Sequence, residues 1–391
     1  LRAVAHHRRG APPEFAAAPP GAVAAGGIYG PLGGGFSRYS VDAFWTVPHF
    51  EKMLYDQAGL VRAYLHGWQA TGNDRWLQVV EETVGYVLRD LRGPDGGIAS
   101  AEDADSEGEE GKFYVWTPDE VRAVLGDADG QAAIDWYGVT AAGNFEGRTI
   151  LHRPVRGELA RPPAIESARQ RLYDAREKRV RPGLDDKVLT EWNAMFIAAL
   201  AEAGAAAGRA DWIDAAVETA EFLLAGLRDD RGRWLRSWQG GQARHLAYAA
   251  DHAWLVDAFT RLAEATGQAR WIDEAMTVAQ ATILRFWDHA GGGLFTTAHD
   301  AEKLIVRSKE LIDGATPSAN SVAAVAFLRL AALTGDDDLR LRGEEIVGLL
   351  MPLMSRHPTA FTHALAAVDL LVAGATEVVV PGTSAASEEL V

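Results

Sequence analysis

The chain has 391 residues, of which 48% are hydrophobic and 24% charged, and it contains no cysteine. This length supports one large domain or two to three ordinary ones, with ample apolar area for a core. A formal net charge of −16 without a long basic run argues against nucleic acid or an anionic membrane surface as a partner, and the lack of cysteine excludes disulfides, thiolate metal sites and a cysteine nucleophile.

The first informative segment, residues 26–42, holds six glycines among aromatic and charged side chains. Glycine lets the backbone turn tightly and approach another surface, so Tyr29, Arg38 and Tyr39 are expected to face a ligand or a neighbouring element. A plain glycine-rich loop between helices is the alternative.

The next segment, Val47-Pro-His-Phe-Glu51, contains a proline suited to the first turn of a helix. A helix that starts at Pro48 would place His49, Lys52 and Asp56 on one face, because these residues are spaced by three and four positions. The sequence therefore predicts a polar helix start directly after the glycine-rich segment.

Apolar residues at three- and four-residue steps predict helices along most of the chain. Residues 191–207 are nearly apolar all round, whereas 74–91 and 211–227 are amphipathic and more charged. This contrast predicts alternating inner and outer helices that close into an α/α toroid; an open α-solenoid is the alternative. The repeat is marked by four similar segments, each between two helical runs: Gly72-Asn-Asp-Arg-Trp76, Gly208-Arg-Ala-Asp-Trp212, Gly267-Gln-Ala-Arg-Trp271 and Gly335-Asp-Asp-Asp-Leu339.

Polar residues recur just before and within the first turns of the expected inner helices. In a toroid these positions surround the mouth, which makes them candidates for a site. The alternative for each is a structural role, since Asp251 and Ser318 can cap helices, Thr190 is a plausible N-cap, and Glu191 can favour a helix dipole. These polar positions are His49, Asp186, Lys187, Glu191, Trp192, Asn193, Asp251, His252 and Glu310.

The acidic stretch that begins at Asp103 resembles the start of a calcium loop. An EF-hand requires a glutamate at its twelfth position, and Tyr114 stands there instead. Solvated acid is the simpler interpretation, with one or two carboxylates within reach of the mouth. No zinc, P-loop, nucleophile-elbow or dinucleotide motif is present, so neither a metal nor a cofactor is expected.

Six phrases in this sequence resemble the family of spermatogenesis-associated, thioredoxin-domain-containing proteins, in the same order and over residues 26–380. They are Gly-Gly-Ile-Tyr with Leu-Gly-Gly-Gly-Phe-Ser-Arg-Tyr-Ser-Val-Asp (26–42), Val-Pro-His-Phe-Glu-Lys-Met-Leu-Tyr-Asp (47–56), Glu-Gly-Lys-Phe-Tyr-Val-Trp (110–116), Asn-Phe-Glu-Gly (144–147), Asp-Asp-Lys-Val-Leu-Thr-Glu-Trp-Asn-Ala (185–194) and Asp-Gly-Ala-Thr-Pro-Ser-Ala-Asn-Ser (313–321).

The resemblance implies an all-α fold, an (α/α)6 toroid of the six-hairpin glycosidase type with short β-hairpin or loop insertions, similar to N-acylglucosamine 2-epimerases. It also implies a thioredoxin-like domain before Leu1. We expect residues 1–25 to match poorly, 26–375 to form the barrel, and 376–391 to begin a strand that is cut short. Gly30 stands where the family usually has aspartate, which would impair catalysis if that carboxylate takes part.

Two functional hypotheses follow. The first is a carbohydrate-active enzyme of the sugar epimerase or glycosidase type, acting at the barrel mouth on a small-molecule or oligosaccharide substrate. The second is a non-catalytic module that binds a glycan or protein and works with the thioredoxin-like domain, and a purely structural scaffold is the weakest alternative. We expect no nucleic-acid or membrane partner and a cytoplasmic location. The acid/base candidates are Asp251, Glu191, His49, Asp103 and Glu310, and the binding candidates are Tyr29, Arg38, Tyr39, Asp186, Lys187, Trp192, Asn193 and His252.

Overall fold

The computed structural model describes residues 20–155 and 160–374. The chain divides into two compact units, Leu1–Ala247 and Tyr248–Val391. The predicted segment 1–25 falls mostly outside the described residues, and the predicted strand over 376–391 lies wholly outside them. None of the described helices combines the length and the apolar character needed to cross a bilayer.

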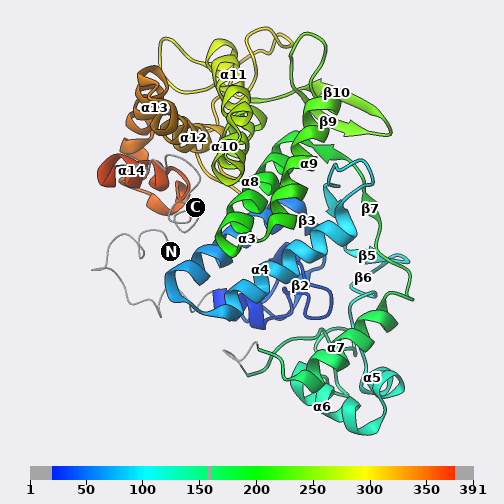
Figure 1. The fold of residues 1–391 in the computed structure, drawn as a ribbon. Coiled ribbons are helices and arrows are strands. Elements are labelled where there is room, and N and C mark those ends of the chain that lie inside the picture. Colours follow the sequence, from blue (N-terminus) through cyan, green and yellow to red (C-terminus); the bar gives the residue numbers. More distant parts are fainter. Residues whose placement is uncertain (1–19, 156–159, 375–391) are drawn as a thin grey trace. The chain divides into compact units, whose positions relative to one another are not determined.

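The first unit is built on two buried helices that pack against each other, α3 (Leu54–Thr71) and α8 (Thr190–Ala207) (Figure 1). Each also packs against an amphipathic helix that follows it in the chain, α4 (Asp74–Tyr86) and α9 (Ala210–Gly226). A π-helical segment, η1 (Val87–Leu91), continues α4. The buried and amphipathic helices thus form the two layers that the periodicity predicted.

Short strands lie in the connections between helices, and several of them come just before α3 and α8. β1 (Tyr39–Ser40) pairs with β2 (Pro48–His49), and β5 (Asp105–Ser106) pairs with β6 (Glu109–Glu110), both antiparallel. One three-stranded sheet joins β3 (Lys52–Met53), β4 (Ala101–Glu102) and β7 (Leu184–Asp185), and the other joins β8 (Val188–Leu189), β9 (Leu235–Gln239) and β10 (Gln242–Leu246). Residues from distant parts of the chain therefore meet where α3 and α8 begin.

Between α4 and α8 the first unit contains three helices that the sequence did not predict individually: α5 (Pro118–Leu125), α6 (Asp127–Tyr137) and α7 (Pro163–Arg176). The three helices pack on one another (Figure 1). A separate apolar cluster between them includes Trp116, Tyr137 and Leu172. A capping box formed by Thr117 and Glu120 starts α5. This region lies between the first and second of the four repeat segments, at Gly72–Trp76 and Gly208–Trp212.

The second unit repeats the two-layer pattern. The buried helices α10 (Ala249–Thr266) and α12 (Ala319–Thr334) pack on each other, and α11 (Ala269–Phe286) and α13 (Asp337–Met354) follow them. A 3-10 turn, η2 (Pro358–Ala360), leads to the last helix, α14 (Ala364–Ala373). The glycines of the four predicted repeat segments end α3, α8, α10 and α12, each in the left-handed conformation that glycine adopts most readily: Gly72, Gly208, Gly267 and Gly335.

Three glycine pairs are tied to a following helix by the same device. A buried side-chain amide accepts a hydrogen bond from the backbone N–H of the residue after the pair and donates one to its carbonyl. Gln57 holds Phe36 at 2.7 and 2.8 Å, Asn193 holds Ile98 at 3.0 and 2.9 Å, and Asn320 holds Leu294 at 2.8 and 3.0 Å. Each amide thus anchors a turn to a buried helix.

Two local predictions are wrong. Pro48 does not begin a helix, because residues 48–49 and 52–53 pair as strands and α3 starts only at Leu54. His49, Lys52 and Asp56 therefore do not share a helix face. Thr190 is not an N-cap; it lies inside α8, and its hydroxyl donates to the carbonyl of Leu235 at 2.6 Å.

Candidate functional site

Four candidates predicted from the sequence come together at the start of α3. In the β1–β2 pair Tyr39 lies opposite His49, and their rings stack with centroids 5.2 Å apart. His49 Nδ1 lies 2.8 Å from Glu110 Oε1, and its Nε2 lies 3.5 Å from Glu51 Oε2. Both ring nitrogens of the imidazole thus face carboxylates.

Arg38 extends this group toward the helix. Its guanidinium lies 3.8 Å from Glu51 Oε2 and 5.9 Å from the ring centroids of both Tyr39 and Tyr55. Tyr55 in turn meets Trp192 of α8 edge to face, at 4.8 Å between ring centroids. Arg38 is exposed and Trp192 half-buried, so the group borders solvent.

Asp56 supplies a carboxyl group with unusual acidity. One of its oxygens, Oδ2, is buried and has no hydrogen-bond partner among the described residues. Burial raises the pKa of Asp56 to about 7, with Arg38 opposing the rise and Glu51 adding to it. This carboxyl therefore exchanges its proton near neutral pH. We refer to Arg38, Tyr39, His49, Glu51, Tyr55, Asp56 and Trp192 as the Asp56 cluster.

The loop between β1 and β2 is held by Asp42. Partial burial would raise the pKa of this carboxyl, but the backbone N–H groups of Thr46, Phe44 and Val47 hold it below its usual range. Phe44 is 69% exposed at the tip of the loop. A fixed loop with an apolar tip thus borders the Asp56 cluster through Tyr39.

Chemically, the Asp56 cluster combines carboxyl groups with aromatic faces and a cation. A carboxyl that titrates near pH 7 is suited to general acid or base catalysis. The rings of Tyr39 and Trp192 present apolar surface of the kind that packs against sugar faces, and the buried ring of Tyr55 supports Trp192 from behind. No group of three or more histidine, aspartate or glutamate side chains among the described residues could hold a metal ion.

The candidates at the start of α8 have other partners. Glu191 is buried, and its Oε2 lies 3.4 Å from Arg236 Nη2. Asn193 is completely buried, and its side-chain amide forms hydrogen bonds with the backbone of Ile98 and with the carbonyl of Leu189. Lys187 pairs with Asp185 at 2.9 Å. The arrangement of Asn193 supports an anchoring role and leaves its amide turned away from solvent.

Asp186 lies at a second opening of the first unit. Its Oδ1 accepts a hydrogen bond from Gln239 at 2.6 Å. With Phe222 and Trp238, whose rings meet edge to face at 5.2 Å, it lines a cavity of about 240 Å³. We refer to this space as the Trp238 cavity.

The remaining first-unit candidates lie apart from these groups. Asp103 is exposed and accepts a hydrogen bond from the backbone of Ala104 at 2.7 Å. Tyr29 is buried, and its hydroxyl donates to Glu82. Burial raises the pKa of Tyr29 well above its usual range. A direct role in binding would require Tyr29 to be uncovered.

Three candidates belong to the second unit. Asp251 is fully buried and accepts a hydrogen bond from the backbone of Tyr248 at 2.7 Å, so it caps α10. His252 is buried with its Nδ1 3.1 Å from the carbonyl of Tyr248 and its ring 4.9 Å from that of Phe286. Glu310 is exposed, and its backbone carbonyl accepts from Asn320 at 2.9 Å.

Sequence reasoning missed a buried ionic cluster centred on Lys52 and Glu102. Tyr86 and Tyr114 each donate a hydroxyl hydrogen bond to Glu102 at 3.0 Å, and Arg181 donates to it at 2.9 Å. Lys52 lies 4.4 Å from the centroid of the Tyr86 ring. Burial lowers the pKa of Lys52 to about 7, with Glu102 opposing the fall. The partners of Glu102 are up to 79 positions away in the chain, so no local pattern could reveal them.

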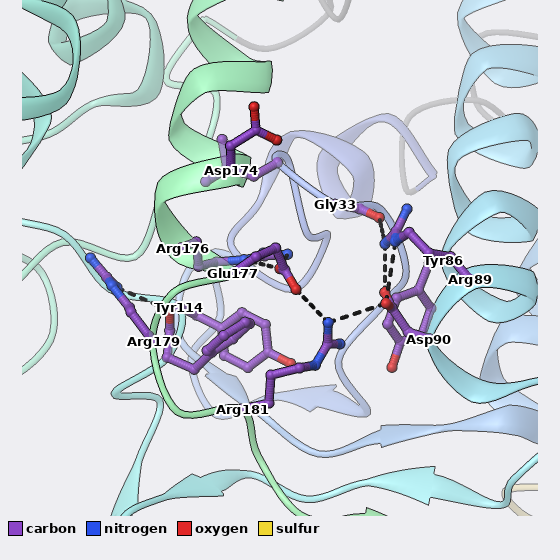
Figure 2. Close-up of polar contacts among 12 residues, drawn as sticks. Gly33, Tyr86, Arg89, Asp90, Tyr114, Asp174, Arg176, Glu177, Arg179 and Arg181 are labelled. Atoms are coloured by element: carbon purple, nitrogen blue, oxygen red, sulfur yellow. Dashed lines mark hydrogen bonds and ion pairs between the residues drawn. The ribbon is translucent and has the colours of Figure 1, made fainter.

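Figure 2 shows the arginine-rich side of this cluster. Arg181 lies between Glu177 and Asp90, with nitrogen-to-oxygen distances of 2.5 and 3.2 Å. Arg89 pairs with Asp90 and donates to the carbonyl of Gly33 at 2.8 Å. Ion pairs from Glu177 to Arg89, and the hydrogen bond from Arg89 to Gly33, thereby join the end of α7 to the glycine-rich segment.

The comparisons with solved structures identify the fold. Cellobiose 2-epimerase from Spirochaeta thermophila matches with a TM-score of 0.55 and 13% identity, over 88% of this chain and 70% of its own. A sugar epimerase from a ruminal bacterium matches with a TM-score of 0.53 and 12% identity, over 83% and 67%. The fold predicted from the sequence is confirmed: it is all-α, of the (α/α)6 toroid type, with short β insertions.

No protein-family model matches the chain. Spermatogenesis-associated protein 20 of Homo sapiens is 33% identical over 94% of this chain, and that of Mus musculus is 34% identical over 81%. The chain spans about half the length of these relatives, 52% and 46% respectively. The resemblance seen in the sequence is thereby confirmed, and over 94% of its length the chain is a homologue of the spermatogenesis-associated protein 20 family.

Proposed function

We propose that this chain performs acid/base chemistry on a sugar at the Asp56 cluster, as an epimerase or a glycosidase. The observation that carries the proposal is the Asp56 carboxyl, half-buried beside Arg38 and with a pKa of about 7. A group of this acidity can both give and take a proton at neutral pH. Solved structures with this fold include sugar epimerases, which supports the substrate class.

Within the cluster each group has a proposed role. Asp56 exchanges the proton with substrate, and Arg38 steadies the charge that develops next to it. Glu51 is the second carboxylate, and His49, held between Glu51 and Glu110, orients it. Trp192, packed against the buried ring of Tyr55, forms the wall against which the sugar ring packs.

The test is a screen of reducing sugars in deuterated buffer, read by NMR for deuterium at C2, for epimeric products and for released sugars. Deuterium exchange with a new epimer indicates an epimerase, and new reducing ends from disaccharides indicate a glycosidase. Asp56→Asn should reduce the turnover rate at least 100-fold. Asp211→Asn, an exposed carboxylate on α9, is the matched control and should leave turnover unchanged.

The pH profile then assigns the direction of proton transfer. If Asp56 acts as an acid, it must be protonated, and the rate falls as pH rises through about 7. If it acts as a base, the rate rises over the same interval. A rate that is independent of Asp56 at every pH would contradict the proposal.

A second candidate function, sugar binding without turnover, is favoured by the Trp238 cavity. Its aromatic pair and the carboxylate of Asp186 offer ring stacking and hydrogen-bond acceptors to a hydroxylated ligand. Titration of cellobiose and mannose against tryptophan fluorescence would measure this binding. Trp238→Ala should weaken it at least tenfold while Asp56→Asn retains it; the reverse pattern would locate the sugar at the Asp56 cluster.

A further inference from the structure

A small cavity lies beneath the glycine-rich segment and has two buried cations on its wall. Lys52 is 2% exposed and Arg176 is 5% exposed, and both line the cavity together with Gly30, Ser37 and Tyr114. About 20 Å³ is open to the centre of a water-sized particle, and a cavity needs about 10–15 Å³ by this measure to hold one water. The cavity therefore has room for one water molecule or one small ion.

Lys52 is incompletely satisfied in this position. Its Nζ donates to the carbonyl of Gly34 at 3.0 Å, while a lysine ammonium carries three donors. Among the residues that the structure describes, none places a carboxylate oxygen within 4.0 Å of that nitrogen. Its remaining neighbours are the faces of Tyr86 and Tyr114, with ring centroids at 4.4 and 5.1 Å.

Gly30 leaves the space next to the ammonium open. A Cβ atom at this position would lie 3.0 Å from Lys52 Nζ and 2.6 Å from the carbonyl oxygen of Gly34. The backbone around it is closed on itself, since Gly30 donates to Gly35 at 2.9 Å and accepts from Gly34 at 2.7 Å. The opening is thus a fixed feature of the loop.

When Lys52 carries its proton, the charges around the cavity do not balance. The cations are Lys52, Arg89, Arg176 and Arg181, and the carboxylates are Asp90, Glu102 and Glu177. Every one of these carboxylates already pairs with an arginine, and Figure 2 shows the pairs of Asp90 and Glu177. Arg176 and Lys52 repel each other across a region of low polarity, where such repulsion is weakly screened.

We propose that this cavity is a binding site for one small monovalent anion, of the size of chloride, held between Lys52 and Arg176. A neutral water molecule could fill the space but would leave the excess positive charge uncompensated. An anion would accept hydrogen bonds from the free donors of Lys52 and lower the repulsion from Arg176. Sulfate is too large for this space, whereas formate, the smallest carboxylate, is closer in size to chloride.

The first experiment is direct. Crystals grown without halide and transferred to sodium bromide are expected to show an anomalous scattering peak within about 3.5 Å of Lys52 Nζ, a normal distance for a charge-assisted contact to a large anion. A cavity that holds only water, with no anomalous signal, would overturn the proposal. This measurement needs no variant, so it does not depend on the folding of one.

The second experiment measures affinity in solution through the line width of the ³⁵Cl NMR signal. The wild-type chain should broaden the line, formate should compete, and sulfate at matched ionic strength should not. Lys52→Met should reduce the excess broadening at least tenfold, whereas Lys112→Met, at a partly exposed lysine paired with Glu109, should leave it unchanged. Equal broadening by wild type and Lys52→Met, with circular dichroism showing both folded, would also contradict the proposal.

Discussion

The side-chain amide of Asn193 forms two hydrogen bonds with the backbone of Ile98, accepting from its N–H at 3.0 Å and donating to its carbonyl at 2.9 Å. These two residues are 95 positions apart, and Asn193 is fully buried. The amide therefore satisfies backbone groups of a glycine turn that would otherwise be buried without partners.

Replacing the amide of Asn193 should lower the stability of the fold. Asn193→Ala leaves a buried donor and a buried acceptor of Ile98 unpaired, so we expect a loss of about 2–4 kcal/mol in the free energy of unfolding. Urea unfolding followed by circular dichroism measures it. Gln170→Ala, at an exposed amide on α7, should change that energy by less than about 0.5 kcal/mol. If the two variants were equally stable, the amide would have no anchoring role.

The raised pKa of Asp56 predicts that this residue lowers the stability of the fold by an amount that depends on pH. Because its folded-state pKa of about 7 lies above the unfolded value of 3.8, the folded chain holds this proton more tightly, and stability falls as pH rises from about 4 to about 7. Asp56→Asn removes the titration. The variant should therefore gain stability relative to wild type over that interval and keep the gain above it. Unfolding midpoints at pH 4.5, 6 and 7.5 compare the two chains, and a constant difference would refute the shift.

The lowered pKa of Lys52 predicts the opposite change, a stability that rises with pH. Its folded-state pKa of about 7 lies below the unfolded value of 10.5, so the folded chain loses this proton first and stability rises with pH between about 7 and 10. Below pH 7 the cost of burying the charged ammonium is fully present. The stability of Lys52→Met relative to wild type should therefore decline from pH 7 to pH 10. The comparison is made in chloride-free buffer, since a bound anion would raise the pKa of the lysine.

Gly30 offers a complementary test. Gly30→Asp and Gly30→Asn both place a Cβ atom 2.6 Å from the carbonyl of Gly34, so both should strain the loop and lose stability. Only the aspartate brings a negative charge next to Lys52, which should raise the lysine pKa by about one unit or more relative to the asparagine variant. NMR titration of the lysine side chain reads this directly. Equal pKa values in the two variants would mean that the side chain at position 30 points elsewhere.

Helices were predictable because their signals are local. Residues 191–207 were expected to be helical, and α8 runs from Thr190 to Ala207. The error at Pro48 has a distant cause: β1 pairs with β2, and β3 with β4, which keeps residues 48–53 extended. A proline that suits a helix start also suits a short edge strand, and only the partner strands decide between them.

The candidate site was predictable in part for the same reason. Arg38, Tyr39, His49 and Trp192 were singled out from the sequence and lie in one cluster. Asp56 was noticed for its spacing but not proposed, since its burial depends on the fold around it. Whether any of these residues acts on a substrate stays a prediction.

The three-stranded sheet β3–β4–β7 has a consequence for the order of folding. Residues 52–53 pair with 101–102, and these pair in turn with 184–185, so the sheet is complete only after most of the first unit has left the ribosome. Helices α3 and α4 can form early from local contacts, while pairings of such sequence separation come late. We therefore expect nascent chains that stop near residue 180 to leave the Lys52 amine open to acylating reagents, and longer chains to protect it.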